Sequence, residues 1–514
     1  MAEQAITTSK RLIYNTLFNV ITPFVNGAVN FFLVPFFLGH LGQARYGVWL
    51  LVGGIIFSAP LFTLGLNSAI NRHIPVCLAK NDYEGIRRVI STSLFFLSAL
   101  AVLIAVISLV VYWNIGSWFA IQPELVRTAQ LLVLLVGFCF VLAMPLDLAS
   151  AVLSGLQRYD LINLAMLVTL VPRTVLLVVL LLHGYGLLTL GLVFGISEVA
   201  VRVIYSICVV RLLPKAFLSP WDIDFRLLRD MLGYGVNTFL YTTGALIIYK
   251  ASTIIIAIFI GTEQITQFYT AAVGVLLLAQ FLQTFTAAIK PAISDLDARN
   301  DQKRVKELSF LTQKYSLLLI IPGACFLVIM GREFLQIWVG EKFQDPRLIN
   351  SMAAILAILT VGHCIRLAQH SNFLVLVGRG EHKVFGILTA LTAILCVVGS
   401  VVSVRLADWG MLGIAWSNLV PIALISGVFL PIYFNWKMKV SMQEVIARVW
   451  RPAILGCLPS VLLIGIWKCV APPDSWAEIF AVVIATMAVT VAGSWFLSLE
   501  RIERRRFASI LTRS

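Results

Sequence analysis

The sequence predicts an all-α membrane protein that crosses the bilayer many times. Of its 514 residues, 60% are hydrophobic and only 12% are charged, and the mean hydropathy is +0.93. Soluble domains contain about 45–50% apolar and about 25% charged residues, so this composition excludes a soluble fold of this length. Long uncharged runs recur along the chain, and runs of about 20 such residues are what a bilayer core requires.

We expect fourteen transmembrane helices from these runs. Some of these helices include a charged residue. The first apolar run is longer than the apolar region of a secretory signal peptide and lacks a cleavage site, so we expect no signal peptide. The expected spans are 12–38, 46–72, 89–113, 128–153, 161–182, 187–210, 231–260, 266–289, 310–331, 349–377, 384–404, 411–435, 452–470 and 478–499.

The distribution of Lys and Arg predicts that both termini are cytoplasmic. Of the 39 basic residues, seven would lie on the outer side and four within spans, which leaves 28 on the inner side. Cytoplasmic loops carry such an excess of Lys and Arg. The net charge of +14 therefore reflects topology, and no nucleic-acid partner is expected. The basic tail, 500–506, is interpreted as a solvated topology signal, with contact to anionic lipid as the alternative.

An internal repeat predicts two homologous six-helix lobes in parallel orientation, followed by two C-terminal helices. The segment Leu78–Asp82 resembles Asp297–Asp301 at a shift of 219, and Gly155 matches Gly378 at a shift of 223. Related lobes of this kind build secondary transporters, which hold their substrate between the lobes. The expected domains are an N-terminal lobe at 1–215, a cytoplasmic linker helix at 216–230, a C-terminal lobe at 231–436, and the last two spans with the basic tail at 437–514.

Polar residues form a stripe along the first expected span. Their spacings of 4, 3, 4 and 4 place them on one helical face, which contacts either another helix or water. Four amides and one hydroxyl are more polar groups than a single helix–helix contact needs. We therefore favour the interpretation that the stripe faces a hydrated cavity. The residues of this stripe are Asn15, Asn19, Thr22, Asn26 and Asn30.

Three cations within spans are candidate substrate-binding residues. Arg173, Lys250 and Arg366 lie in the fifth, seventh and tenth expected spans. An Arg or Lys at the centre of a membrane helix costs roughly 2.5–3.5 kcal/mol, so these cations should face water, carboxylates or an anionic ligand. His363 and His370 flank Arg366 at spacings of 3 and 4 and extend its polar face.

Two carboxylates are expected inside the membrane, and both are candidates for coupling transport to protons or sodium. Glu198 lies four residues before Arg202, so these two most simply form an ion pair. Asp147, two residues after Pro145, is then left to pair with one of the three other cations. The interior stays net positive, which suits an anionic substrate.

The sequence contains none of the catalytic motifs that would indicate an enzyme. It has no phosphate-binding GxxxxGK[ST] loop, no HExxH and no GxSxG, and its eight cysteines form no CxxC pair. We therefore expect a protein that is not an enzyme, without cofactor or bound metal.

Three motifs carry a family resemblance. They are Ala44–Trp49 in the second span, Gly155–Tyr159 after the fourth and Gly331–Gly340 after the ninth. They resemble the polysaccharide-transport family, the Wzx-like O-antigen and oligosaccharide flippases of the multidrug/oligosaccharidyl-lipid/polysaccharide (MOP) superfamily. The likeness covers essentially the whole chain, including the expected number of spans.

The resemblance implies two helical lobes around a central, often cationic, cavity. It implies flipping of an undecaprenyl-diphosphate-linked oligosaccharide, such as an O-antigen, exopolysaccharide or capsule repeat unit, to the outer leaflet of the bacterial inner membrane by alternating access. The implied partners are the lipid-linked oligosaccharide and membrane lipids, with a polysaccharide polymerase and chain-length machinery as candidate protein partners.

Other functions stay open. Within the superfamily, the alternatives are a flippase for the peptidoglycan lipid precursor and a drug/cation antiporter, although no Asp or Glu occurs between Glu3 and Asp82, where the antiporters typically carry one. A polyprenyl-dependent membrane glycosyltransferase or acyltransferase is a third alternative, but the expected first outer loop, Gly39–Arg45, has no acidic residue. A scaffold is the fourth, and cations inside the membrane argue against it.

Overall fold

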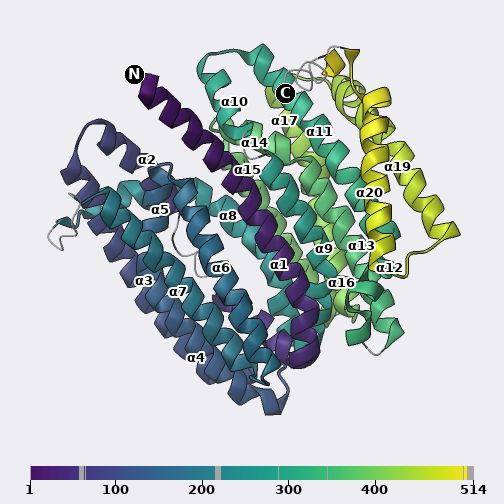
Figure 1. Cartoon of the computed structure of the whole chain (residues 1–514), viewed down its shortest axis with the longest axis horizontal. Helices are drawn as coiled ribbons and strands as arrows, with labels where there is room; N and C mark the ends of the chain where they lie inside the picture. Colours follow the sequence, from purple (N-terminus) through teal and green to yellow (C-terminus); the bar gives the residue numbers. More distant parts are fainter. Residues whose placement is uncertain are drawn as a thin grey trace. The chain divides into compact units, whose positions relative to one another are not determined.

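The computed structural model describes residues 2–56, 63, 65–214, 222–286, 289–343, 345–501 and 503–505, with the side chains of these residues from 18 onward except 234–238, 290–291 and 382. In these ranges the chain forms helices and turns and no β-strand (Figure 1). Thirteen helical stretches there are long and apolar enough to cross a membrane. The structure therefore confirms the all-α polytopic fold.

The chain forms two compact units. Unit 1 is Met1–Thr266 with Thr389–Ala393, and unit 2 is Gln267–Leu388 with Ile394–Ser514. The helices of unit 1 are α1 (Ala2–Ile56), α2 (Leu66–Ala79), α3 (Tyr83–Trp118), α4 (Pro123–Leu146), α5 (Leu148–Gly155), α6 (Tyr159–Leu182), α7 (Leu187–Leu212) and α8 (Phe225–Phe259). Helix α9 (Thr262–Thr286) begins in unit 1 and continues in unit 2.

The remaining helices belong to unit 2, except for five residues of α15. They are α10 (Ile289–Ala298), α11 (Gln302–Ile329), α12 (Gly331–Val339), the 3-10 turn η3 (Gly340–Lys342), α13 (Pro346–Ala368), α14 (His370–Gly378), α15 (His382–Arg405), α16 (Gly410–Leu424), α17 (Leu430–Met438), α18 (Met442–Val445), α19 (Arg451–Val470) and α20 (Trp476–Gly493). Three π-helical turns, η4 (Ile425–Phe429), η5 (Ile446–Trp450) and η6 (Ser494–Ser498), interrupt or end the later helices.

Helix α1 explains why the structure shows thirteen candidate spans where the sequence predicts fourteen. Gly42 interrupts its 55 residues with φ 78° and ψ 168°, so α1 is two helices joined at a bend. A glycine adopts this backbone conformation without the steric cost that a Cβ atom would bring. The helix after the bend belongs to the expected second span, 46–72. Residues 57–62 and 64 of that span lie outside the described residues.

Close contacts join the bend of α1 to the adjoining ends of α8 and α9 in unit 1. The Thr266 hydroxyl donates a hydrogen bond to the Gln43 carbonyl at 2.8 Å. A Cβ atom at Gly47 would lie 1.8 Å from the Thr262 carbonyl oxygen, so only glycine fits there without displacement. Nearby, the Ala120 amide donates to the Ala257 carbonyl at 2.7 Å. We call this set of contacts the seam.

The turns before α3 and α11 have the same structure, as the sequence repeat predicts. Asn81 and Asn300 both have positive φ, 55° and 59°. The Asp that follows each of them caps the next helix, because Asp82 accepts a hydrogen bond from the Gly85 amide and Asp301 from the Arg304 amide. Asn tolerates the left-handed conformation better than most residues, which explains why Asn-Asp appears at both turns.

The halves also share a helix break. Helix α4 stops at Leu146 and α5 starts at Leu148, while α13 stops at Ala368 and α14 starts at His370. The expected linker helix at 216–230 is only partly visible. Residues 216–221 lie outside the described residues, and the last part of this segment is the beginning of α8, which Asp224 caps. The lobe boundaries stay a prediction.

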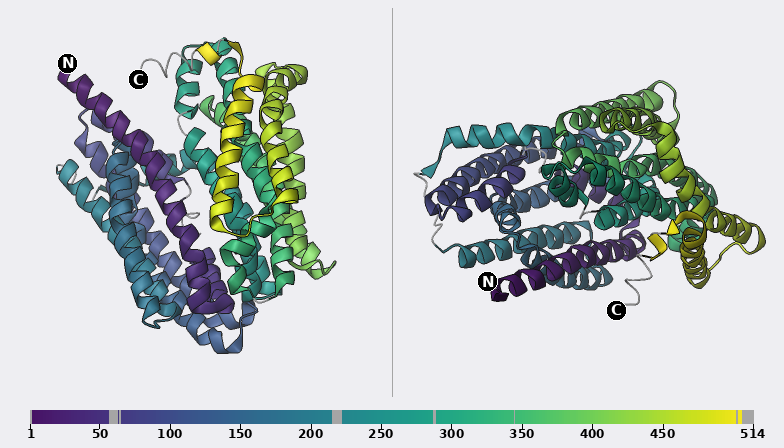
Figure 2. Two further views of the ribbon diagram at one scale, coloured as in Figure 1. Left: turned by 45° about the vertical axis from the view of Figure 1, so that its right-hand side comes forward. Right: turned by 90° about the horizontal axis from the view of Figure 1, so that it is seen from above.

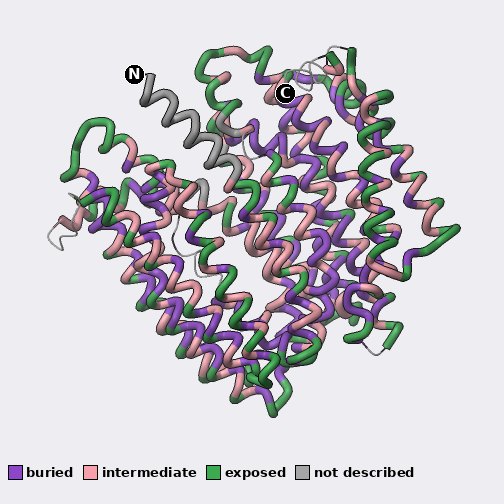
Figure 3. Tube along the Cα trace, viewed as in Figure 1, coloured by how far each residue is buried: buried purple, intermediate pink, exposed green. Residues whose placement is uncertain are grey.

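Helix packing within each unit follows the burial pattern. In unit 1, α3 packs on α4, α4 on α7, α7 on α6 and α6 on α1; in unit 2, α11 packs on α13 and α19, and α19 on α20 (Figure 2). Buried and exposed positions alternate along the helices (Figure 3). In α3 the buried positions recur every three or four residues, for example at Leu97, Leu100, Ala101 and Ile104. This period is that of one helical face, and the other face is left to lipid.

Candidate functional site

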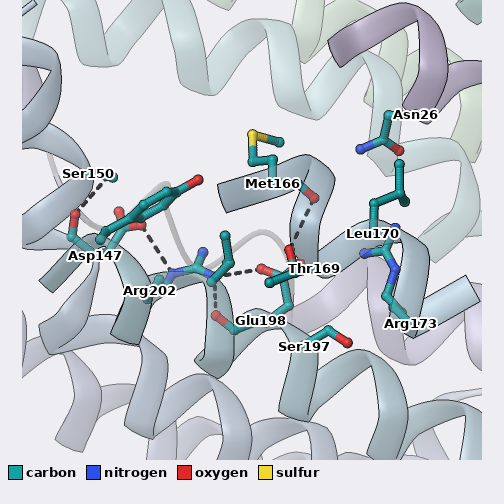
Figure 4. A pocket seen from close by; sticks show the side chains of 12 residues that line it. Asn26, Asp147, Ser150, Met166, Thr169, Leu170, Arg173, Ser197, Glu198 and Arg202 are labelled. Carbon is teal, nitrogen blue, oxygen red and sulfur yellow. Dashed lines mark hydrogen bonds and ion pairs between the residues drawn. The ribbon is translucent and has the colours of Figure 1, made fainter. Parts of the chain in front are cut away.

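A polar pocket of about 250 Å³ lies inside unit 1, among helices that are candidate membrane spans. Its walls come from α1, from the α4–α5 break, and from α6 and α7 (Figure 4). The polar and charged residues that line it include Asn26, Asp147, Thr169, Arg173, Glu198 and Arg202. Four of these are candidate site residues that the sequence predicts.

The break between α4 and α5 brings Asp147 to this pocket. Pro145 ends the regular hydrogen bonding of α4, because proline has no amide hydrogen and its ring crowds the preceding turn. The Ser150 hydroxyl then donates to the Asp147 carbonyl at 2.8 Å, which stabilises the restart of the chain as α5.

Arg202 holds both carboxylates of the pocket. Its Nε donates to Asp147 Oδ1 at 3.1 Å, and its Nη1 donates to Glu198 Oε2 at 2.6 Å. The guanidinium side chain is only 15% exposed, so these ion pairs are shielded from water. The predicted pair of Glu198 with Arg202 is confirmed. The expectation that Asp147 pairs with another cation is wrong, because α7 presents Arg202 to the α4–α5 break.

Arg173, on α6, differs from Arg202 because it contacts an aromatic ring and not a carboxylate. Its guanidinium lies 4.7 Å from the ring centre of Phe194 on α7. Within the part of the chain that the structure describes, Arg173 makes no hydrogen bond or ion pair. Figure 4 shows Arg173 and Asn26 on one side of the pocket and the Asp147–Arg202 pair on the other. In this pocket, Arg202 uses its N–H groups to bind the two carboxylates, whereas Arg173 has N–H groups that bind neither of them.

The stripe on α1 has mixed surroundings. Asn26 lines the pocket and accepts a hydrogen bond from Asn30 at 2.7 Å. Asn19 contacts a neighbouring helix instead, because its side-chain oxygen accepts from Asn163 of α6 at 2.7 Å. Thr22 is 2% exposed. The side chain of Asn15 lies outside the described residues.

The other predicted cations lie elsewhere. Lys250 is half-buried on α8 of unit 1, outside the set of residues that line the pocket. Arg366 is half-buried near the end of α13 in unit 2, and His363 of the same helix is 7% exposed. His370 begins α14, with its ring 5.7 Å from that of Phe373.

Neutral side chains fill the second helix break, in unit 2. Gln313 of α11 donates a hydrogen bond to the Asn372 side-chain oxygen, and Asn372 donates in turn to the side chain of Gln369 at 2.6 Å. The hydroxyls of Ser316 and Ser371 are 3.1 Å apart. All five side chains are at most 5% exposed. We call these residues the amide network.

Sequence reasoning missed three features. It treated Arg202 only as the partner of Glu198, and it did not identify Phe194, although Phe194, Glu198 and Arg202 recur every four residues on one face of α7. It also interpreted the C-terminal tail as solvated, whereas Glu503 accepts hydrogen bonds from Lys314 at 2.6 and 2.7 Å, and Lys314 is 4% exposed. No signal in the sequence connects residues this far apart.

Solved transporters and flippases have the same fold as this chain. A multidrug resistance MATE family transporter of the MOP superfamily, in an inward-facing conformation, matches with a TM-score of 0.68 at 15% identity, over 83% of this chain and 98% of the transporter. The lipid II flippase MurJ, in an inward closed conformation, matches with a TM-score of 0.67 at 12% identity, over 95% of this chain and 98% of MurJ. The chain therefore has the MOP superfamily fold.

The family follows from the sequence itself. The model of a family described as polysaccharide biosynthesis proteins matches residues 41–346, which is more than half of the chain, so the protein belongs to that family. The expected family resemblance is thereby confirmed.

Two curated relatives are archaeal. The probable low-salt glycan biosynthesis flippase Agl15 of Haloferax volcanii is 22% identical over 410 residues, 77% of this chain and 78% of the relative. The uncharacterized membrane protein MJ1068 of Methanocaldococcus jannaschii is 23% identical over 334 residues, 62% of this chain. The chain covers 64% of that relative, slightly less than two thirds of its length.

Proposed function

We propose that this protein is a flippase that moves a lipid-linked oligosaccharide from the inner to the outer leaflet of its membrane. Its family of polysaccharide biosynthesis proteins supports this role, as does the printed name of the Haloferax relative, a glycan biosynthesis flippase. The shared fold with a lipid II flippase is consistent with it. In this proposal the chain is a transporter and not an enzyme.

The observation that carries the proposal is Arg173 in the pocket of unit 1. A cation on a membrane helix needs water, a carboxylate or an anionic ligand. The carboxylates that line this pocket, Asp147 and Glu198, are bound to Arg202, whereas Arg173 keeps its N–H groups. A diphosphate offers several acceptor oxygens, and a guanidinium binds them in a two-pronged way that an ammonium group cannot reproduce.

The proposed substrate is an oligosaccharide on undecaprenyl diphosphate, and the proposed membrane is the bacterial inner membrane. Lys250 and Arg366 add positive charge along the path of the diphosphate, and His363 and His370 extend the polar surface around Arg366. Asn15, Asn19, Thr22, Asn26 and Asn30 supply hydrogen-bonding groups along α1. A polysaccharide polymerase and the chain-length machinery then receive the flipped product.

The membrane potential can drive this export. An inside-negative potential favours the outward movement of an anion by about 2.3 kcal/mol per charge per 100 mV, and a diphosphate carries about two negative charges. Asp147 and Glu198 remain the proposed sites for an added contribution from protons. Measuring flipping with the potential and the pH gradient imposed separately distinguishes these two sources of energy.

Reconstitution into liposomes tests the proposal. We expect the wild type to flip a fluorescent polyprenyl-diphosphate oligosaccharide, Arg173→Ala to lose at least about tenfold in rate, and Arg173→Lys to retain part of the activity because it keeps the charge. Arg226→Ala, at an exposed position of α8, is the matched control. Wild-type flipping by a well-expressed Arg173→Ala variant contradicts the site. Transport of cationic drugs but not of the glycan lipid indicates an antiporter instead.

The proposed orientation has its own test. Reporter fusions after Asn81 and Asp301 should report the cytoplasm, and fusions after Gly184 and Asp474 should report the outside, with both chain termini cytoplasmic. The opposite pattern at all four positions contradicts the orientation derived from the basic residues.

A further inference from the structure

The geometry points to Phe194 as a positioning residue that keeps Arg173 available for an anionic ligand. The identity of that ligand, a diphosphate, rests on the proposed function. The position of Arg173 does not, because it follows from contacts within unit 1.

Arg173 sits at the end of an aromatic column that three helices build. Trp49 of α1 packs on Phe194 of α7, with ring centres 4.9 Å apart and planes at 43°. The same Phe194 ring contacts Arg173 of α6, whose guanidinium carbon lies 4.7 Å from the ring centre. Trp49 is 7% exposed, so the column is anchored in the interior of unit 1.

A ring contact of this kind leaves a guanidinium chemically competent. Arg stacks on aromatic rings through its flat face, whereas its N–H donors point outward in the plane of the group. The stacked Arg173 therefore keeps its donors for a ligand in the pocket, which the Arg173 side chain lines. A carboxylate partner would instead occupy those same donors.

A competing carboxylate is within one helical turn. Phe194 and Glu198 are four residues apart on α7, so their side chains lie on the same face about one turn, or 5.4 Å, apart. Both Glu198 and Arg173 line the pocket. The long, flexible side chain of Arg173 can span this distance once the ring no longer holds it. Glu198 already binds Arg202, and an ionised carboxylate accepts from two arginines through its two oxygens.

Phe194 therefore decides between two states of the same arginine. With the ring, Arg173 stays on Phe194, and its N–H donors form no direct bond to a carboxylate within the part of the chain that the structure describes. Without it, Arg173 turns toward Glu198, and the pocket loses the free hydrogen-bond donors of Arg173 although no charged residue has been changed. The role of Phe194 is thus to prevent self-neutralisation of the site.

Binding measurements on the full-length protein in lipid nanodiscs test this inference. The probe is farnesyl diphosphate, and farnesol is the matched control for partitioning into the lipid. We expect Phe194→Leu to weaken diphosphate binding about 3- to 30-fold, the range that a cation–π contact supplies. Phe194→Tyr restores binding because it keeps the ring.

A double variant separates positioning from packing. Glu198→Gln removes the competing charge, so the added change Phe194→Leu should weaken binding by less than about twofold in the Glu198→Gln background. If Phe194 only fills space, the effect of Phe194→Leu is the same in both backgrounds, and the inference is overturned.

Chemical modification of Arg173 gives a readout that needs no substrate. Phenylglyoxal reacts with accessible guanidinium groups, and peptide mass spectrometry reports the rate at Arg173 alone. We expect Phe194→Leu to slow the reaction several-fold, and Glu198→Gln to restore it. An unchanged rate at Arg173 in Phe194→Leu overturns the positioning role. If these rates behave as expected but the wild type binds no farnesyl diphosphate, the proposed function fails while the positioning role stands.

Discussion

The two helix breaks, one in each half of the chain, have the same backbone form and different chemistry. At a shift of 223, Leu146–Leu148 becomes Gln369–Ser371, so Asp147 of the first break corresponds to His370 beside the second. The first break is held by ion pairs to Arg202, the second by the amide network. A repeated fold thus preserves where helices bend, while the residues at each bend diverge.

The difference teaches where a ligand site can be placed. An amide network satisfies its own hydrogen-bonding groups and leaves no net charge for a ligand. In the ion-pair cluster, Arg202 binds both carboxylates, so the hydrogen-bond donors of Arg173 are left for a ligand. The first half of the chain therefore places arginine donors beside its helix break, on a scaffold that the second half repeats.

Removing Arg202 should have the largest effect on stability. Arg202→Met removes the cation that Asp147 and Glu198 share, and breaking a shielded ion pair by removing one partner costs about 3–5 kcal/mol. Thermal unfolding in detergent should show a much lower midpoint. Arg229→Met, at an exposed site, is the control. Adding Asp147→Asn and Glu198→Gln to Arg202→Met should recover most of the stability; failure to do so would mean that Arg202 acts through packing.

Breaking the amide network should cost less and should not depend on pH. Gln313→Leu leaves the buried Asn372 oxygen without its donor, at a cost of about 1–3 kcal/mol. The unfolding midpoint should fall equally between pH 5 and pH 8, because no group of the network titrates there. Gln443→Leu, at an exposed position of α18, serves as the control. A strong pH dependence would show that the two breaks are not as different as their side chains indicate.

The smallest effect is expected at the two repeated turns. Asn81→Ala and Asn300→Ala should each cost about 1 kcal/mol, because alanine is strained at positive φ, whereas the corresponding glycine variants should be close to neutral. Comparing unfolding midpoints of the four variants tests whether the halves share this device. Unequal costs for the two alanine variants would show that the turns resemble each other only in sequence.

The fold was largely predictable because hydrophobic runs and repeated turns are local signals. Uncharged runs fixed most spans, and Asn81 with Asn300 marked equivalent turns. The sequence predicts two spans on either side of Gly42, but hydrophobic runs do not encode the backbone angles of the bend between them. The site was only partly predictable. The spacing of Glu198 and Arg202 is local, but their contact with Asp147 depends on how α7 packs against the α4–α5 break.

Long-range partners explain the other omissions. Phe194 resembles any apolar residue in a membrane helix, and only the packing of α6 against α7 places it beside Arg173. Glu503 and Lys314 are separated by 189 residues, and no periodicity relates them. Side chains that act through such contacts are recognisable only after the helices have been placed.

The seam at the bend of α1 has an energetic consequence for any motion at that end of unit 1. Separating α1 from α9 there breaks the hydrogen bond of Thr266 with Gln43, which is worth about 0.5–1.5 kcal/mol net. This bond favours the packed arrangement of α1 and α9 by roughly 2- to 13-fold, a bias that differential ligand affinity can reverse. Because Gly47 has no Cβ atom, the Thr262 carbonyl packs directly on α1. A single methyl group at this position would therefore shift the equilibrium between the packed and separated arrangements of α1 and α9, without touching the pocket.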